Sequence, residues 1–190
     1  MTVYIETERL KLRDWQDSDL APFARMNADP LIMEYYPRTL NEKASNRLVK
    51  NFQNHINKHG YGFFAIESIE TSQFIGFTGL GTVKLDVPFT PATEIAWRLD
   101  YGAWGKGYGT EAALACAQQG FNTYALKEIV AFSVSDNTRA VHMMEKIGMT
   151  RDAKGDFIYP GLTKEHRVGN YALYRLKKQP PCSAHNFHLL

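Results

Sequence analysis

The chain has little cysteine, no long apolar run and almost no net charge. Its two cysteines, Cys116 and Cys182, do not indicate a disulfide framework, so a reducing cytoplasm is the expected compartment. No apolar run approaches membrane-spanning length, and the first residues lack the apolar segment of a secretory signal. A net charge of +2 does not favour nucleic acid or a membrane surface as the main partner. The expected class is a cytoplasmic globular protein without a nucleic-acid or membrane partner.

The length and composition are typical of one globular domain. The chain has 190 residues, of which 44% are apolar and 22% charged, enough to bury a sizeable core. We expect a single domain over residues 1–178. The last residues contain Pro180 and Pro181 and show no periodicity, so residues 179–190 are predicted to form a flexible tail.

Hydrophobic periodicity predicts an α+β fold. Asp17 or Ser18 is expected to cap the first helix, and the T-x-x-E spacing of Thr39 and Glu42 indicates a capping box. The predicted elements, in chain order, are a strand at 10–13, helices beginning near 17, 30 and 39, strands at 61–69, 74–85 and 94–99, a helix at 112–121, a strand at 129–134, a helix from 136 or 137 to 147, and strands at 157–159 and 171–176.

The most informative segment is Trp104–Glu111, where Gly105, Gly107 and Gly109 fall at alternate positions. It lies between a predicted strand and a predicted helix. Glycines allow close backbone approach, and a helix start presents free N–H groups to an anion. The segment therefore predicts a phosphate or pyrophosphate site, although a glycine turn that only connects strand to helix remains an alternative.

The glycine spacing does not match two common nucleotide motifs. A dinucleotide fingerprint requires G-x-G-x-x-G, and a Walker loop requires its lysine after the last glycine, whereas Lys106 stands between the first two. An unrelated ATP-binding or NAD-binding protein stays open as a hypothesis, and competition of these nucleotides with coenzyme A would test it.

Trp104–Ala112 resembles the pyrophosphate loop of the GNAT (Gcn5-related) N-acetyltransferases. The family pattern [QR]-x-x-G-x-[GA] is matched at Gly107 and Gly109, with Trp104 in the first position. The segments 6–13, 27–30 and 74–80 resemble the branch that acetylates ribosomal-protein N-terminal alanines. The resemblance implies a mixed, mostly antiparallel sheet flanked by helices, with a V-shaped splay between two central parallel strands.

The resemblance also implies acetyl-CoA or coenzyme A as cofactor, without a metal. The loop residues expected to hold the pyrophosphate, mainly through their backbone, are Trp104, Gly105, Lys106, Gly107, Tyr108, Gly109 and Thr110. The pantetheine arm is expected to pair with the strand backbone at Trp97 and Leu99, where a backbone N–H would face the thioester carbonyl. The side chain of Asn137 is expected at the mouth of the gap, as an arm ligand, a helix cap or both.

The catalytic groups are less defined by the resemblance. Glu94, at the start of the cofactor strand, matches a glutamate of many relatives and is the candidate general base; a structural or substrate-orienting role is the alternative. In many relatives a tyrosine that acts as general acid stands where this chain has Met144. The thiolate would then leave unaided, or take a proton from water or another residue such as Tyr101 or Tyr108.

The predicted activity is acetyl transfer to a primary amine by direct attack in a ternary complex. The acceptor is a protein N-terminus or a small molecule, and the protein is a monomer or homodimer; a non-catalytic acyl-CoA-binding domain is the alternative. Tyr159 stands where relatives often have histidine, which leaves the acceptor open. The pool of acceptor-side residues is Tyr35, Tyr36, Phe63, Phe64, Phe157, Tyr159 and His166.

Two histidine-containing groups resemble metal ligands only superficially. His55 and His59 lie four residues apart, but Ile56 stands where a zinc protease has glutamate. Cys182, His185 and His188 lack a fourth ligand nearby. We therefore expect no metal.

Overall fold

A computed structural model describes residues 1–178. Its nine strands form one sheet in the order β1-β2-β3-β4-β5-β6-β9-β7, with β8 paired to β9. The strands are β1 (Val3–Glu6), β2 (Leu10–Arg13), β3 (Phe63–Ser68), β4 (Phe74–Thr82), β5 (Thr93–Leu99), β6 (Glu128–Val134), β7 (Thr150–Arg151), β8 (Phe157–Ile158) and β9 (Asn170–Lys177). The helices are α1 (Asp17–Ala28), α2 (Glu42–His59), α3 (Tyr108–Asn122) and α4 (Thr138–Lys146), with short 3₁₀ turns at Tyr101–Ala103 and Ala153–Gly155.

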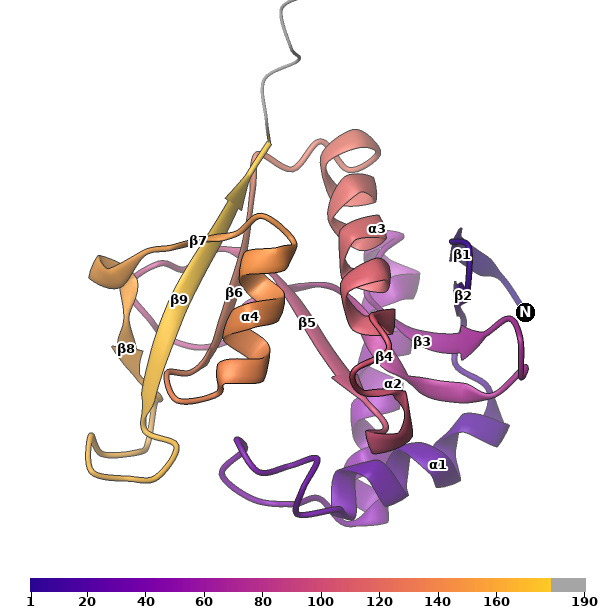
Figure 1. Ribbon diagram of the computed structural model, residues 1–190, viewed down its shortest axis with the longest axis horizontal. Helices are drawn as coiled ribbons and strands as arrows, with labels where there is room; N and C mark the ends of the chain where they lie inside the picture. The colour runs from indigo at the N-terminus through magenta and orange to yellow at the C-terminus, as the bar shows by residue number, and fades with distance from the viewer. Residues whose placement is uncertain (179–190) are drawn as a thin grey trace, which may run out of the picture.

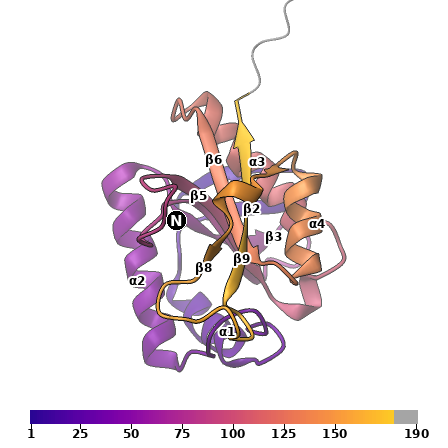
Figure 2. The ribbon, with the colours of Figure 1, turned by 90° about the vertical axis from the view of Figure 1, so that its left-hand side faces the viewer.

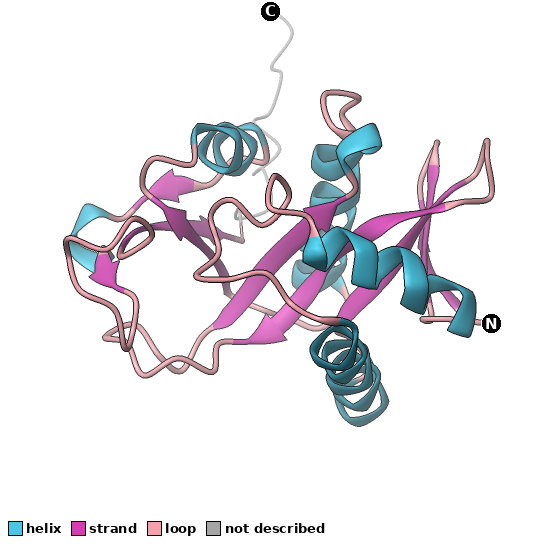
Figure 3. Cartoon of the chain, turned by 90° about the horizontal axis from the view of Figure 1, so that it is seen from below, coloured by secondary structure: helices cyan, strands magenta, loops and turns pink. Residues whose placement is uncertain are grey.

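Helices cover both faces of the sheet. Figures 2 and 3 show α2 and α4 on opposite sides of the strands. The helix α3 packs against β4, β5 and α4, whereas α1 and α2 pack against each other and against β4 and β3 respectively. This arrangement confirms the α+β class with a flanked, mostly antiparallel sheet.

The two central parallel strands diverge. Every residue of β5 pairs with β4, and every residue of β6 pairs with β9, but β5 and β6 share one register pair, Glu94 with Val130. Beyond that pair the strands separate toward their C-terminal ends, as Figure 1 shows. The V-shaped splay is therefore confirmed, and its open end exposes backbone groups of both strands.

Small residues bring α3 close to the sheet. Ala112, Ala113, Cys116 and Ala117 are all buried and recur at helical spacing on one side of the helix. An added Cβ at Gly120 would stand 2.8 Å from a side-chain carbon of Leu80. The close approach places the N-terminus of α3 beside the end of β5, where the site lies.

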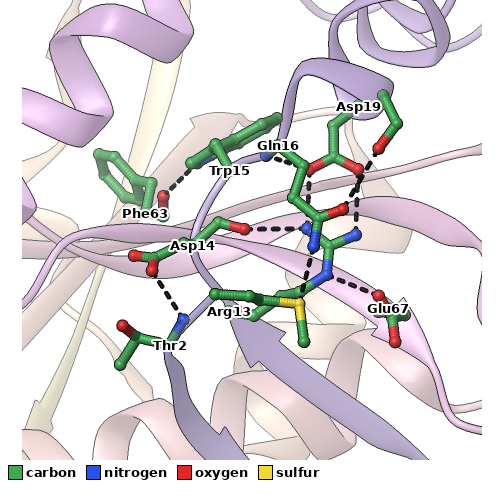
Figure 4. A network of polar contacts seen from close by, with 10 residues as sticks. Thr2, Arg13, Asp14, Trp15, Gln16, Asp19, Phe63 and Glu67 are labelled. Atoms are coloured by element: carbon green, nitrogen blue, oxygen red, sulfur yellow. Dashed lines mark hydrogen bonds and ion pairs between the residues drawn. The ribbon is translucent and has the colours of Figure 1, made fainter.

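A buried ionic network joins β2, α1 and β3 (Figure 4). The Arg13 guanidinium donates to both carboxylate oxygens of Asp19, at 2.7 and 3.0 Å, and to Glu67 at 2.6 Å. Side-chain exposure is 3% for Arg13 and 2% for Asp19, so the pair is fully desolvated. Beside it, the Trp15 indole donates to the backbone oxygen of Phe63 over 2.8 Å.

The structure corrects several element predictions. Residues 30–36 form turns and a bend rather than a helix, because Arg139 and Arg167 hold Glu34 and Tyr36 by long-range contacts. The first helix is capped at Gln16 instead of Asp17 or Ser18, with the Asp19 side chain accepting from the Gln16 N–H. Asn41 caps α2 instead of Thr39, since its side chain accepts from the Ala44 N–H over 2.9 Å.

Other boundaries differ because tertiary pairing overrides local pattern. The strands β1 and β7 were not predicted, and β4 ends at Thr82 rather than residue 85. The helix α3 begins at Tyr108, four residues earlier than predicted, so the last loop glycine is helical. Residues 179–190, which were predicted to form a tail, lie outside the described part of the chain. The three residues weighed there as metal ligands, Cys182, His185 and His188, lie outside it as well. Within residues 1–178, no helix combines the length and apolarity of a membrane span.

Candidate functional site

A cavity of about 380 Å³ opens between the end of β5 and α4, beside the glycine loop. It is lined by Ile32, Tyr35, Tyr36, Trp97, Arg98, Leu99, Ala103, Trp104, Gly105, Gly107, Gly109, Thr110, Asn137, Arg139, Ala140, His142, Met143 and Lys146. These residues come from the segment after α1, the end of β5, the glycine loop, the start of α3 and one side of α4. Most of the predicted cofactor residues therefore meet in one cavity.

The glycine loop presents free backbone donors to this cavity. Gly105 and Gly107 have φ values of 72° and 80°, left-handed conformations that favour glycine. Gly107 is the N-cap of α3, and the Glu111 N–H already donates to the Gly107 oxygen. The N–H groups of Tyr108, Gly109 and Thr110 precede that first helical bond, so they and the helix dipole suit an anion.

An ion pair holds the loop from outside the cavity. Arg9 donates to the Lys106 oxygen over 2.9 Å and pairs with Glu111 over 2.6 Å. Burial acts to raise the pKa of Glu111, but hydrogen bonds from Thr7 and Arg9 outweigh it and hold that pKa below its usual range. The Arg9 guanidinium also stacks over the Tyr108 ring. Lys106 and Tyr108 do not line the cavity, so the structure separates them from the other predicted loop residues.

Trp104 connects the loop to β5. Its indole Nε1 donates to the backbone oxygen of Leu99 over 3.0 Å. The Arg139 guanidinium stacks over the Trp104 ring at 4.5 Å from the centroid. The side chain thus fixes the distance between the end of β5 and the first loop glycine.

Asn137 caps α4 at the edge of the same cavity. Its Oδ1 accepts from the Ala140 N–H over 3.2 Å, and its Nδ2 donates to Ser133 Oγ over 3.0 Å. Each amide atom keeps one further hydrogen-bonding position. A capping role and a role toward a ligand are therefore compatible in this geometry.

Glu94 lies at the closed end of the V, outside the set of cavity-lining residues. Burial raises the pKa of Glu94 to about 7, with Lys84 acting in the opposite direction. A carboxyl with this pKa exchanges its proton near neutrality, which is the property required of a general base.

The family model of the GNAT acetyltransferase domain matches residues 9–150. The chain belongs to this family. It is 34% identical to the uncharacterized protein YkkB of Bacillus subtilis (strain 168) over 146 residues, 75% of this chain and 83% of that protein.

Solved structures share its fold. An acetyltransferase from Agrobacterium tumefaciens str. C58 superposes with a TM-score of 0.73 at 26% identity, over 92% of this chain and 94% of that one. RimL, a ribosomal L7/L12 alpha-N-protein acetyltransferase solved in complex with coenzyme A, superposes with a TM-score of 0.71 over 93% and 98% of the two chains. At 14% identity, this second likeness concerns the fold alone.

In this GNAT chain the helix α4 contains no tyrosine that could act as general acid. Met144 is 1% exposed and packs in the core, whereas its neighbour Met143 lines the cavity. Tyr101 is 58% exposed and contacts Trp104 edge to face, with ring centroids 5.1 Å apart.

Sequence reasoning missed four polar residues of the cavity. Arg139, His142 and Lys146 lie on one side of α4, at the helical spacing i, i+3 and i+7 that could have revealed them. Arg98 follows Trp97 on β5 and reaches the cavity from the sheet. No Asp or Glu is among the described residues that line this cavity.

The acceptor-side pool divides in two. Tyr35 and Tyr36 line the cavity, because the segment after α1 is held against α4 and the chain before β9. Glu34 pairs with Arg139 over 2.9 Å, and Arg167 donates to the backbone oxygens of Glu34 and Tyr36. The other members, which do not line the cavity, are Phe63, Phe64, Phe157, Tyr159 and His166.

Within residues 1–178, no group of three or more His, Cys, Asp or Glu side chains is arranged to hold a metal ion. The rings of His55 and His59 lie against each other at a tilt, with centroids 4.5 Å apart.

Proposed function

We propose that this protein transfers an acetyl group from acetyl-CoA to a primary amine, by direct attack in a ternary complex. The observation that carries the proposal is the cavity between the diverging end of β5 and α4, with the N-terminus of α3 at its edge. Coenzyme A bound to the fold neighbour RimL supports the choice of cofactor. The site residues fit a pyrophosphate chemically, because Gly105, Gly107 and the first turn of α3 supply backbone donors without a carboxylate in the cavity lining.

The pantetheine arm would pair with the unpaired backbone at the open end of β5. Trp97 and Leu99 line the cavity there, and β6 has already separated from the strand. The Leu99 oxygen already accepts a hydrogen bond from Trp104. We therefore propose backbone N–H groups of β5 as the donors to the pantetheine arm and to the thioester carbonyl. Asn137 would add a side-chain amide from the opposite wall.

Glu94 is the proposed general base. The attacking amine must lose a proton, because an ammonium has no lone pair. In the proposed step Glu94 takes one proton of the substrate ammonium through water, and the amine nitrogen then bonds to the carbonyl carbon. The carbon–sulfur bond breaks, its electron pair leaves with the thiolate, and the second amine proton passes to water. The coenzyme A thiolate leaves without a protein acid from position 144, since Met144 is buried in the core.

Calorimetry with acetyl-CoA, together with a thiol-release assay over a panel of amines, tests the proposal. We expect saturable binding of acetyl-CoA and coenzyme A, and thiol release that depends on an amine. Absence of binding at millimolar acetyl-CoA would overturn the cofactor assignment. Binding without turnover on any protein N-terminal peptide or small amine would instead favour a non-catalytic acyl-CoA-binding domain.

A further inference from the structure

Arg98 is a buried cation without a carboxylate partner among the described residues. It is 8% exposed, and none of the ion pairs formed by residues 1–178 includes it. A guanidinium stays charged, so an uncompensated one is costly to bury. The contrast with Arg13 is direct, because that buried guanidinium pairs with Asp19 and Glu67.

The protein holds Arg98 by one nitrogen and by aromatic rings. Nη1 donates to Asn27 Oδ1, and Asn27 is fixed in turn because its Nδ2 donates to Ser45 Oγ over 2.7 Å. The guanidinium carbon lies 4.2 Å from the centroid of the Tyr36 ring and 5.6 Å from that of Phe77. These contacts orient the guanidinium without neutralising its charge.

The remaining edge of the guanidinium is formed by Nε and Nη2. Nε is buried and has no hydrogen-bond partner in the described chain. Nε and Nη2 form a fork that matches the two oxygens of a carboxylate. Arg98 also lines the cavity beside Tyr36, so we assign this unpaired edge, rather than the Nη1 edge held by Asn27, to a ligand in the cavity.

The charge of the cavity favours the same kind of ligand. Its lining contains Arg98, Arg139 and Lys146 and, among the described residues, no acidic side chain. Arg139 and Lys146 lie on α4, whereas Arg98 lies on β5 with Asn27 and Tyr36 beside it. Arg139 already pairs with Glu34 over 2.9 Å, so Arg98 is the buried cation of this lining without an acidic partner among the described residues.

We infer that the acceptor carries a carboxylate as well as its amine, and that Arg98 binds this carboxylate. The inference rests on the proposed function, because it assigns the amine to acetyl transfer. Glu94 and Arg98 are four residues apart and project from the same face of β5. At about 3.3 Å per residue, their Cα atoms are about 13 Å apart. An acceptor with amine and carboxylate at opposite ends, such as a short peptide or an ω-amino acid, fits this separation.

Equilibrium binding to the protein saturated with coenzyme A tests the inference without requiring turnover. The probes are triglycine, 4-aminobutyrate and glycine, each compared with its carboxamide in calorimetry. We expect at least one carboxylate to bind roughly 10- to 100-fold more tightly than its amide, the range of a charged hydrogen bond. Equal affinities within every pair, or no binding of any carboxylate, would overturn the inference.

Variants separate recognition from a structural role. Arg98→Gln should bring the carboxylate-to-amide ratio close to one, and Arg98→Lys, which keeps the charge but lacks the fork, should lower it less. Arg151→Gln makes the same charge change at an exposed ion pair outside the cavity lining and should leave the ratio unchanged. A ratio that survives in folded Arg98→Gln would overturn the inference. If Arg98→Gln does not fold, the carboxylate-to-amide affinity ratios of the wild type and of Arg98→Lys still test the inference.

Thiol release measured on the same samples distinguishes the two proposals. Turnover of amines without preference for a carboxylate would leave acetyl transfer standing and refute the role of Arg98. Carboxylate binding that depends on Arg98, with no turnover on any amine, would refute acetyl transfer but keep the anion site.

Discussion

The indole of Trp104 donates a hydrogen bond to the backbone oxygen of Leu99 over 3.0 Å. This bond joins the last residue of β5 to the residue before the first loop glycine. The strand that would pair with the pantetheine arm and the loop that would bind the pyrophosphate are thereby held at one separation. A cofactor that contacts both elements depends on that separation.

Trp104→Phe should weaken acetyl-CoA binding by about fivefold and lower the free energy of unfolding by about 1 kcal/mol, the usual contribution of one hydrogen bond. The ring contact with Arg139 is retained in this variant, so the loss isolates the indole N–H. Calorimetry and urea unfolding measure the two effects. Tyr101→Phe, at an exposed neighbour, is the control and should change neither; an unchanged affinity in Trp104→Phe would contradict the prediction.

Gly107→Glu should abolish binding of coenzyme A, because it places a carboxylate at the N-cap of α3 where we propose the pyrophosphate. The φ of 80° also strains any side chain at this position, so Gly107→Ala is needed as a control for backbone strain. The alanine variant should lose about 1 kcal/mol of stability and keep measurable affinity. Unchanged affinity in Gly107→Glu would show that the pyrophosphate binds elsewhere.

Glu94→Gln should reduce the rate of acetyl transfer by about 10²- to 10⁴-fold, the usual contribution of a general base. In the wild type, kcat/KM should rise with pH through about 7, as the carboxyl with this raised pKa ionises. In the variant, kcat/KM should no longer rise with pH near 7, while the affinity for acetyl-CoA is unchanged. A profile that keeps its rise near pH 7 in the variant would exclude Glu94 as the base.

The same carboxyl should make stability depend on pH. Its pKa is 4.5 when unperturbed and about 7 in the folded protein, so the folded state keeps a proton that the unfolded state has released. The stabilisation is present below pH 4.5 and is lost as the pH rises through about 7. At 1.36 kcal/mol per pKa unit the loss amounts to about 3 kcal/mol. Urea unfolding of wild type and Glu94→Gln between these pH values should show this slope in the wild type alone.

Arg13→Met should destabilise the protein by about 3–5 kcal/mol, because it leaves the carboxylate of Asp19 buried and unpaired. The matched control is Arg151→Met, which breaks an ion pair whose arginine side chain is 50% exposed. That change should cost less than about 1 kcal/mol. Thermal or urea unfolding compares the two, and equal losses would contradict the assigned difference in burial.

Local patterns predicted the strands and helices around the site well. The glycine spacing at residues 105–109 requires particular backbone conformations, and the structure has two of these glycines in the left-handed region. The segment after Asp29 was predicted wrongly as a helix, because its geometry depends on contacts with Arg139 and Arg167, which are more than 100 residues away. The strands β1 and β7 were missed because pairing with β2 and β9, rather than their own patterns, makes them strands.

The order of the predicted elements indicated the mixed sheet, and the resemblance of residues 104–112 and of three shorter segments indicated the family. The glycine spacing at residues 105–109 predicts an anion-binding loop. All of these depend on residue types that are close together in the chain, whereas the polar groups that meet in the cavity are brought together by the packing of distant segments. Arg98 lies far along the chain from Asn27 and Tyr36, and only the packing of these segments shows that none of the described carboxylates pairs with it. The pKa of Glu94 likewise depends on burial, which depends on how strands and helices pack around it.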